Sequence, residues 1–306
     1  MSGYILRRLL QSVATLIVFL TGMFFLVRIT GDQAYAFAPQ DATKADIERL
    51  SISMGLDRPL YVQYFIYMKD VFTGNLGESF KSMTPVTELL AKHSVNTLKL
   101  AMIAVFFGIV VAVPLGVISA VKRFTLFESG IRIFAVIGMS IPHFWLGIIL
   151  IEIFAVELGW VSAGGMKGIG SYILPGLTMS LLLVAGLVRL LRSTMLDVLD
   201  SDFIKFSRMK GVREKMVIWK HALRNALLPV VGFAGVQIAL FLTGSVVTET
   251  VFAWPGIGRL MYQSMMERDF PVLQGTVTLF VLFAILINFI IDILYSYLDP
   301  RIRLVR

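Results

Sequence analysis

Long apolar stretches alternate with polar segments along the 306 residues of the chain. A helix needs about twenty consecutive apolar residues to cross a bilayer. Stretches of that length predict six membrane-spanning helices, near residues 9–28, 98–121, 133–157, 173–191, 226–250 and 272–297. Four of them contain a proline, which membrane helices tolerate where neighbouring groups satisfy the freed carbonyls. The pattern predicts an all-α polytopic membrane helix bundle with both termini on one side.

The composition agrees with this pattern and excludes other classes. The chain is 57% hydrophobic and 16% charged, with a mean hydropathy of +0.80. Soluble domains are about 45–50% apolar and about 25% charged. High hydrophobicity excludes disorder, and a chain without cysteine is not a disulfide scaffold. Residues 9–28 resemble the apolar core of a signal peptide, but no small-residue cleavage site follows, so we expect a retained span.

The distribution of charge predicts the orientation. The net charge is +8, and the segments on the side of the termini carry +2, +2, +5 and +2, or +11 together. The segments on the other side (29–99, 158–172 and 251–271) have no net charge. Short loops rich in Lys and Arg stay in the cytoplasm, so both termini are predicted to be cytoplasmic. The basic charge therefore indicates topology, and no nucleic-acid partner is expected.

The chain divides into three parts by this reasoning. Residues 1–28 are an N-terminal segment with the first span, 29–96 are an extracytoplasmic segment, and 97–306 are a five-helix core with a cytoplasmic loop over 193–228. The extracytoplasmic segment contains two predicted helices, over 42–55 and 59–72. Gly55 is a suitable stop for the first, and Pro59 suits the first turn of the second.

The cytoplasmic loop contains a short helix with an aromatic side. Asp202 is a suitable N-cap and Gly211 a suitable C-terminal stop. Phe203, Phe206 and Met209 recur every three residues and share a face, and amphipathic helices over 193–200 and 213–227 are expected to flank it. An exposed aromatic face needs either a protein partner or the lipid surface to cover it. The residues alone leave both possibilities open.

Several polar residues lie within the predicted spans. Asn288 and Asp292 share a face of the last span, and Asp292 is expected to pair with Arg189. Such residues either line a hydrated path or form interhelical hydrogen bonds. The candidates for the translocation path or for interhelical bonding are His143, Glu152, Gln237, Glu249, Asn288 and Asp292.

Motifs for enzyme chemistry are missing from the sequence. It contains no phosphate-binding G-x-x-x-x-G-K-[ST] loop, no G-x-S-x-G and no H-E-x-x-H. Its three histidines lie on different segments. We expect no catalytic residue and no cofactor or metal bound by this chain.

The segment DFIKFSRMKGVREKMVIWKHALRNALLPV, residues 202–230, carries a family resemblance. It resembles the membrane-spanning permease subunits of ATP-binding-cassette importers, in the branch that handles dipeptides, oligopeptides and nickel. The resemblance covers nearly the whole length. Further blocks include GLDRPLYVQY (55–64), SIPHFWLGIIL (140–150), TETVFAWPGIGRL (248–260) and DILYSYLDPRIR (292–303).

This resemblance implies a role for the cytoplasmic loop. In the family, a loop with a Glu-Ala-Ala pattern and a later glycine docks into a groove on an ATPase subunit. Gly211 matches the glycine, whereas Lys205, Phe206 and Ser207 stand in place of Glu-Ala-Ala. The implied ATPase-coupling residues are Asp202, Phe203, Lys205, Phe206, Ser207, Arg208, Met209, Lys210 and Gly211.

The resemblance also implies a type I importer permease fold, partners and a mechanism. The chain would pair with a homologous second permease, two ATPase subunits carrying ATP and Mg, and an extracytoplasmic substrate-binding protein, in the bacterial cytoplasmic (inner) membrane. It would form half of a path for short peptides. The same role in nickel or metal-chelate uptake is an alternative, and a membrane sensor, a receptor or a channel are alternatives of another class.

Overall fold

The computed structural model describes residues 2–30, 34–35, 38 and 42–298, which divide into two compact units. The first unit comprises residues 1–97 and 255–289, and the second comprises 98–254 and 290–306, so the division falls within α5 and α14. The helices are α1 (Ser2–Thr30), α3 (Lys44–Ser53), α4 (Leu60–Thr73), α5 (Val86–Val121), α6 (Leu126–Ser140), α7 (His143–Leu150), η1 (Ile151–Glu157), η2 (Ile169–Tyr172), α8 (Ile173–Leu199), α9 (Asp202–Met209), α10 (Glu214–Met216), η3 (Val217–Ala222), α11 (Leu223–Gly244), α12 (Val246–Val251), α13 (Ile257–Met266) and α14 (Phe270–Leu298).

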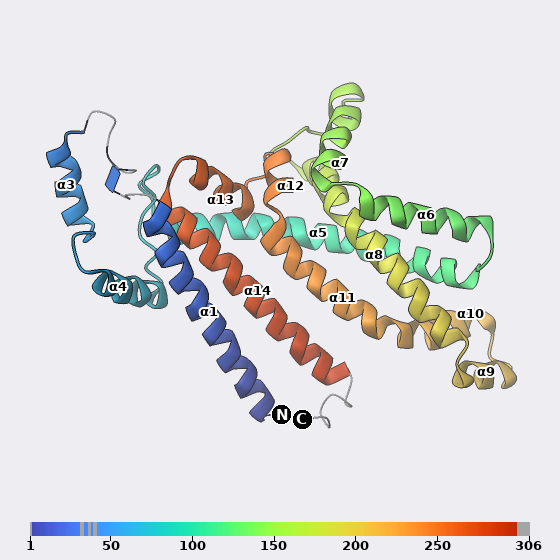
Figure 1. The fold of residues 1–306 in the computed structure, drawn as a ribbon. Helices are drawn as coiled ribbons and strands as arrows, with labels where there is room; N and C mark the ends of the chain where they lie inside the picture. The colour runs from blue at the N-terminus through green and yellow to red at the C-terminus, as the bar shows by residue number, and fades with distance from the viewer. Residues whose placement is uncertain (1, 31–33, 36–37, 39–41, 299–306) are drawn as a thin grey trace. The chain divides into compact units, whose positions relative to one another are not determined.

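Five of the six predicted spans are continuous apolar helices. They run over Leu6–Ile29, Val86–Val121, Ile169–Leu199, Glu214–Leu242 and Phe270–Ile291. The remaining predicted span, over 133–157, is not one continuous helix, because α6 and the helix over His143–Glu157 meet at 103° (Figure 1). Pro142 causes the break: it lacks an N–H and disfavours helical geometry in Ile141, whose ψ is 124°. The two bent helices, α6 and the helix over His143–Glu157, make a sixth span only if they are counted together.

Helix α8 is the centre of the second unit and packs against α6 and α11. Glycines let the neighbouring helices approach it closely. Gly108 and Gly116 of α5 lie against Leu183 and Leu191 of α8, and Gly186 of α8 lies against a ring from α11. Small residues at helix contacts are typical of membrane proteins, where close packing drives association. The position of α8 is therefore fixed from three sides.

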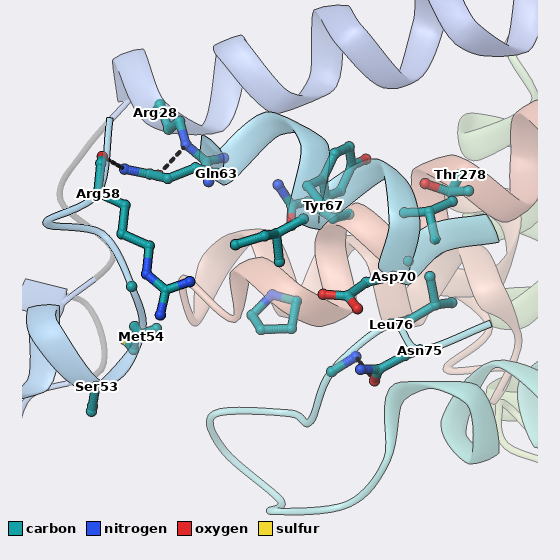
Figure 2. Close-up of a pocket in the computed structure, with 17 residues that line it drawn as sticks. Arg28, Ser53, Met54, Arg58, Gln63, Tyr67, Asp70, Asn75, Leu76 and Thr278 are labelled. Carbon is teal, nitrogen blue, oxygen red and sulfur yellow. Dashed lines mark hydrogen bonds between the residues drawn. The ribbon is translucent and has the colours of Figure 1, made fainter. Parts of the chain in front are cut away.

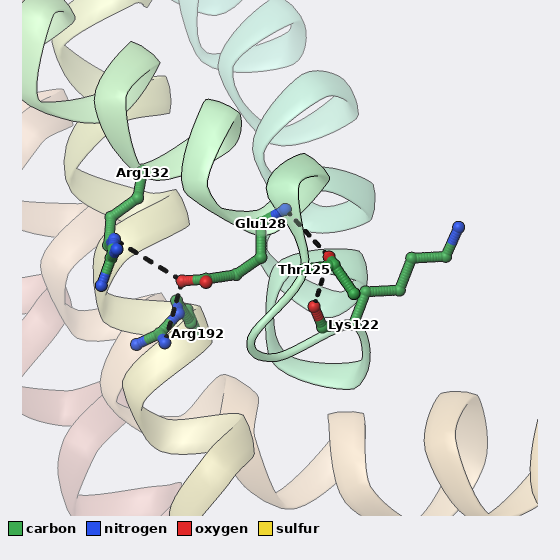
Figure 3. Close-up of polar contacts among 5 residues, drawn as sticks. All are labelled: Lys122, Thr125, Glu128, Arg132 and Arg192. Atoms are coloured by element: carbon green, nitrogen blue, oxygen red, sulfur yellow. Dashed lines mark hydrogen bonds and ion pairs between the residues drawn. The ribbon is translucent and has the colours of Figure 1, made fainter.

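A buried carboxylate links α6 to α8 (Figure 3). Glu128 is 3% exposed, and its Oε1 lies 3.0 Å from the Arg192 guanidinium of α8 and 3.6 Å from that of Arg132. Thr125 begins α6, because its side chain accepts a hydrogen bond from the Glu128 backbone N–H. A buried carboxylate requires such cationic partners, since burial removes its hydration.

The first unit contains the two short helices expected between residues 42 and 72, and both are confirmed. Thr43 and Asp46 form a capping box at the start of α3, which ends before Gly55 at φ +67°. Pro59 precedes α4. Helix α4 packs on α1, where the Tyr64 ring lies 5.3 Å from that of Phe24.

Substitution of Gly108 by alanine tests the packing around α8. The new Cβ would lie 2.9 Å from Cγ of Leu183, which is fully buried and has no room to move. We expect Gly108→Ala to destabilise the protein by about 1–3 kcal/mol, seen as a lower melting temperature in detergent. Gly130→Ala is the matched control, because nothing lies within 4 Å of its Cβ position. Equal melting temperatures for the two variants would contradict this packing.

Candidate coupling site

Helix α9 is the eight-residue helix that the sequence predicted in the cytoplasmic loop. It begins one residue earlier than expected, because Ser201 occupies the N-cap position with extended backbone. The prediction of Asp202 as N-cap is therefore wrong. Asp202 is the first helical residue, where a negative charge favours the helix N-terminus, and its carboxylate accepts a hydrogen bond from Lys205 Nζ at 3.0 Å. Ser201 donates its hydroxyl back to Val198 instead of capping α9.

The end of α9 agrees with the prediction of a glycine stop. Gly211 has φ +75°, in the left-handed region that glycine adopts without steric cost. Its N–H donates to the Arg208 carbonyl, and the Val212 N–H donates to the Ser207 carbonyl. These two bonds form a Schellman motif, which satisfies carbonyls that the end of a helix leaves open. The chain therefore leaves α9 along a fixed direction.

The two sides of α9 differ in exposure. Phe203, Phe206 and Met209 are 45%, 54% and 77% exposed, as their spacing predicted. Lys210 places its ammonium 4.4 Å from the centre of the Phe206 ring. Ile204, on the other side, is fully buried where α9 packs on α8 and η3. The result is a short helix that is anchored on one side and presents an apolar face on the other.

Two ion pairs lie at the base of α9. Arg208 donates two hydrogen bonds to the Glu214 carboxylate, at 3.1 and 2.7 Å. Hydrogen bonding to Glu214 raises the pKa of Arg208 by stabilising the charged guanidinium. Arg123 lies 3.7 Å from Asp200. A cavity of about 210 Å³ lies beside these pairs. Its walls include residues from the ends of α5 and α8 together with Arg208 and Glu214.

Four of these residues were not predicted from the sequence as part of the site, namely Ile204, Glu214, Arg123 and Asp200. Ile204 is the apolar residue of α9 that lies off the aromatic face, and this position is a usable signal for an anchor. Glu214 follows Arg208 by six residues, across the turn, which helical spacing rules do not cover. Arg123 and Asp200 belong to distant segments, and no local pattern connects them.

The flanks of α9 also differ from the expectation of two separate amphipathic helices. Residues 193–199 continue α8 without a break, and the helix over 214–242 begins the next span, with a π-helical turn at η3. Helix α9 therefore directly joins the ends of two apolar spans, as Figure 1 shows for α8, α9 and α10.

The polar residues predicted for the path occupy different environments. His143 begins α7 and is half-buried, and Glu152 is exposed in η1. Gln237 of α11 is buried. Asn288 is exposed and donates to Ala284 of its own helix. The side chain of Asp292 lies outside the described residues, so its pairing with Arg189 stays a prediction.

Glu249 is the most deeply buried of these candidates, in α12 of the second unit. It is fully buried, and its carboxylate accepts a hydrogen bond from the Ser245 hydroxyl at 2.8 Å. Ser245 lies at the junction of α11 and α12, so the bond spans the bend between the two helices. This contact is local in the sequence, so the interhelical hydrogen bond expected of Glu249 stays a prediction. Within the described residues, no three His, Cys, Asp or Glu side chains form a group that could hold a metal ion.

Two family models match the chain. One, the binding-protein-dependent transport system inner membrane component, matches residues 112–304, and its N-terminal companion matches residues 1–101. The spans and the anchored surface helix define a multi-pass helical permease of the bacterial inner membrane. The chain belongs to the family of binding-protein-dependent transport system inner membrane components, whose members are permease subunits and not catalytic themselves.

Two relatives match the chain over nearly its full length. The glutathione transport system permease protein GsiC of Pectobacterium atrosepticum is 40% identical over 304 residues, covering 99% of each chain. The oligopeptide transport system permease protein AppB of Bacillus subtilis is 37% identical over 315 residues, covering 99% of this chain and 100% of AppB.

Solved structures confirm the fold class. The inward-facing MetNI methionine ABC transporter matches with a TM-score of 0.59 and 22% identity, over 69% of this chain and 96% of that one. An amino acid ABC transporter with histidines matches with a TM-score of 0.56 and 14% identity, over 69% and 94%. The chain has the type I importer permease fold.

Substitution of Glu214 by glutamine tests the attachment of α9. The variant keeps the shape of the side chain but removes its charge, so Arg208 loses a charge-assisted pair. Because the pair is partly exposed, we expect a modest effect: amide hydrogen exchange over residues 203–210 accelerates about two- to fivefold. Lys205→Gln, which breaks the pair with Asp202 inside α9, is the control and should change this exchange less. Equal acceleration in both variants would mean that Glu214 does not hold α9.

Proposed function

We propose that this permease forms half of the translocation path of an ATP-driven importer for short peptides, and that α9 couples it to the ATPase. The observation that carries the proposal is α9 itself, a helix anchored by Ile204 whose exposed apolar face needs a partner. Two ATPase subunits hold and hydrolyse ATP with Mg. A homologous second permease completes the path, and an extracytoplasmic binding protein delivers the substrate.

The proposed orientation places both termini and α9 in the cytoplasm. Its support is the charge of +11 on one side of the predicted topology against zero on the other. Residues 29–96 are then extracytoplasmic and meet the binding protein, while residues 1–28 and 97–306 supply the spans. This orientation puts the face formed by Phe203, Phe206 and Met209 on the side where ATP is available.

Coupling follows from how α9 is held. When ATP closes the two ATPases, their grooves displace α9, and α9 shifts the ends of the spans before and after it. This turns the path outward, and hydrolysis returns it inward. A ligand shifts such a two-state equilibrium only through different contacts with the two states. The anchored helix supplies those contacts, with Asp202, Lys205, Ser207 and Lys210 at its margins and Gly211 fixing its end.

Short peptides are the proposed cargo because both full-length relatives described above are named for glutathione or oligopeptide transport. Uptake of nickel or a metal chelate is the alternative. Of the candidate path residues, Gln237 and Glu249 are buried within the second unit, and His143 is half-buried there. A few buried polar groups among apolar side chains suit a path of low selectivity. The extracytoplasmic binding protein then sets the specificity.

Substitution of Phe206 by serine tests the coupling role. Removing an aromatic side chain from the centre of a protein interface costs about 1.4 kcal/mol or more, so ATPase association should weaken about tenfold or more. We expect ATP-driven peptide uptake in proteoliposomes to fall accordingly, while membrane insertion is unchanged because Phe206 is exposed.

Leu126→Ser is the matched control, because Leu126 is 93% exposed at the start of α6 and lies away from α9 in the sequence. It should keep both ATPase binding and uptake. Normal uptake by Phe206→Ser would contradict the docking of α9. Solute flux without ATP in the wild type would indicate a channel and contradict the importer.

A further inference from the structure

A cavity of about 370 Å³ lies entirely within the first unit (Figure 2). Its walls come from the end of α1, the turn between α3 and α4, one side of α4 and the first turns of α14. Its polar lining includes Arg28, Arg58, Gln63, Tyr67, Asp70 and Thr278. Cavities of this size hold small metabolites or a lipid headgroup.

Three charged side chains face this cavity without neutralising one another. Arg58 and Asp70 lie on different sides of it in Figure 2, and among the described residues neither forms an ion pair. Arg28 also has no carboxylate partner among the described residues. Elsewhere in the described part of the chain Arg123, Arg132, Arg192 and Arg208 all lie within 4 Å of a carboxylate. The cavity thus presents two guanidinium groups and one carboxylate to whatever occupies it.

Arg28 is held in place by its neighbours. Its Nε donates to Gln63 Oε1 at 3.0 Å, and its guanidinium lies 3.5 Å from the centre of the Phe24 ring. Gln63 is buried and is itself fixed, because its amide nitrogen donates to the carbonyls of Leu56 and Arg58. This network orients Arg28 and the backbone that carries Arg58.

The position of the cavity along the apolar spans limits which molecules can occupy it. Arg28 is the penultimate residue of the apolar span Leu6–Ile29, and Pro271, Gln274 and Gly275 lie in the first turns of the span that begins at Phe270. The cavity therefore opens where hydrocarbon gives way to water, at the depth of lipid headgroups. Under the proposed orientation this is the extracytoplasmic boundary, where cargo arrives.

From these observations we propose that the cavity binds a small zwitterion, with an oxyanion on Arg58 and an ammonium group on Asp70. Guanidinium groups match carboxylate and phosphate oxygens through paired hydrogen bonds. Two sources supply this chemistry: the termini of a short peptide and the phosphoethanolamine headgroup of a lipid. The peptide source rests on the proposed function, whereas the lipid source does not.

Binding to the purified complex in nanodiscs tests the proposal. For the peptide source, calorimetry compares L-alanyl-L-alanine with its N-acetyl derivative, which lacks the ammonium group. For the lipid source, native mass spectrometry compares retained phosphatidylethanolamine with phosphatidylglycerol, which also lacks it. We expect one zwitterionic probe to bind better than the matched probe that lacks the ammonium group. Arg58→Ala should weaken that binding about tenfold, and Asp70→Asn should abolish the preference for the ammonium-bearing probe.

Arg49→Ala is the matched control, because Arg49 is an exposed arginine of α3 that does not line the cavity. It should leave binding unchanged. Arg58→Lys keeps the charge and should retain part of the affinity, which separates recognition from a folding defect. Failure of both zwitterions to bind, or equal effects of Arg58→Ala and Arg49→Ala, would overturn the site. Because no step uses ATP, a failed uptake assay would count against the proposed function and not against this site.

Discussion

Burial of Ile204 is the contact that holds α9 on α8 and η3. An isolated helix of eight residues is not stable in water, because nucleation costs more than so few hydrogen bonds return. Burying one isoleucine side chain contributes about 1.5–3 kcal/mol. The Schellman motif at Gly211 and the pair between Arg208 and Glu214 add smaller terms. Without Ile204 the aromatic face would have no fixed direction.

The helices next to this anchor are closely packed. Helix α8 is closely packed through Gly108, Gly116 and Gly186, and Glu128 ties it to α6. Such packing deforms little, so under the proposed function a push on α9 would move whole helices. The break at Pro142 and the π-helical turn at η3 interrupt the regular helical geometry of this unit.

Several features that depend on residues close together in the sequence were predicted correctly. The length of the apolar stretches located five continuous spans, and the three-residue spacing of Phe203, Phe206 and Met209 gave their shared exposed face. Gly211 was predictable because few residues other than glycine adopt its backbone angles. The sharp break at Pro142 was not predictable, because a proline within an apolar stretch fits both a kinked span and a broken one. Ser201 and Asp202 are both good caps, and the sequence does not rank them.

Contacts between distant segments were beyond prediction. Glu128 and Arg192 are 64 residues apart, and only the packing of α6 on α8 brings them together. The same holds for Arg28, Arg58 and Asp70, which reach one cavity from three different elements. Ile204 was recognisable as an apolar residue off the aromatic face, but the surface on α8 and η3 that buries it was not predictable from local spacing. Residues that act through tertiary contacts were therefore the ones missed.

Site-specific cross-linking at Met209 tests the central claim most directly. The chain has no cysteine, so Met209→Cys introduces a unique thiol at the most exposed position of the aromatic face, and Met166→Cys, in the loop before η2, is the reference. Our account predicts that a short bifunctional reagent joins residue 209, and not residue 166, to the ATPase subunit in the assembled importer. Labelling of residue 209 by a lipid-soluble reagent, with no cross-link to the ATPase, would contradict it.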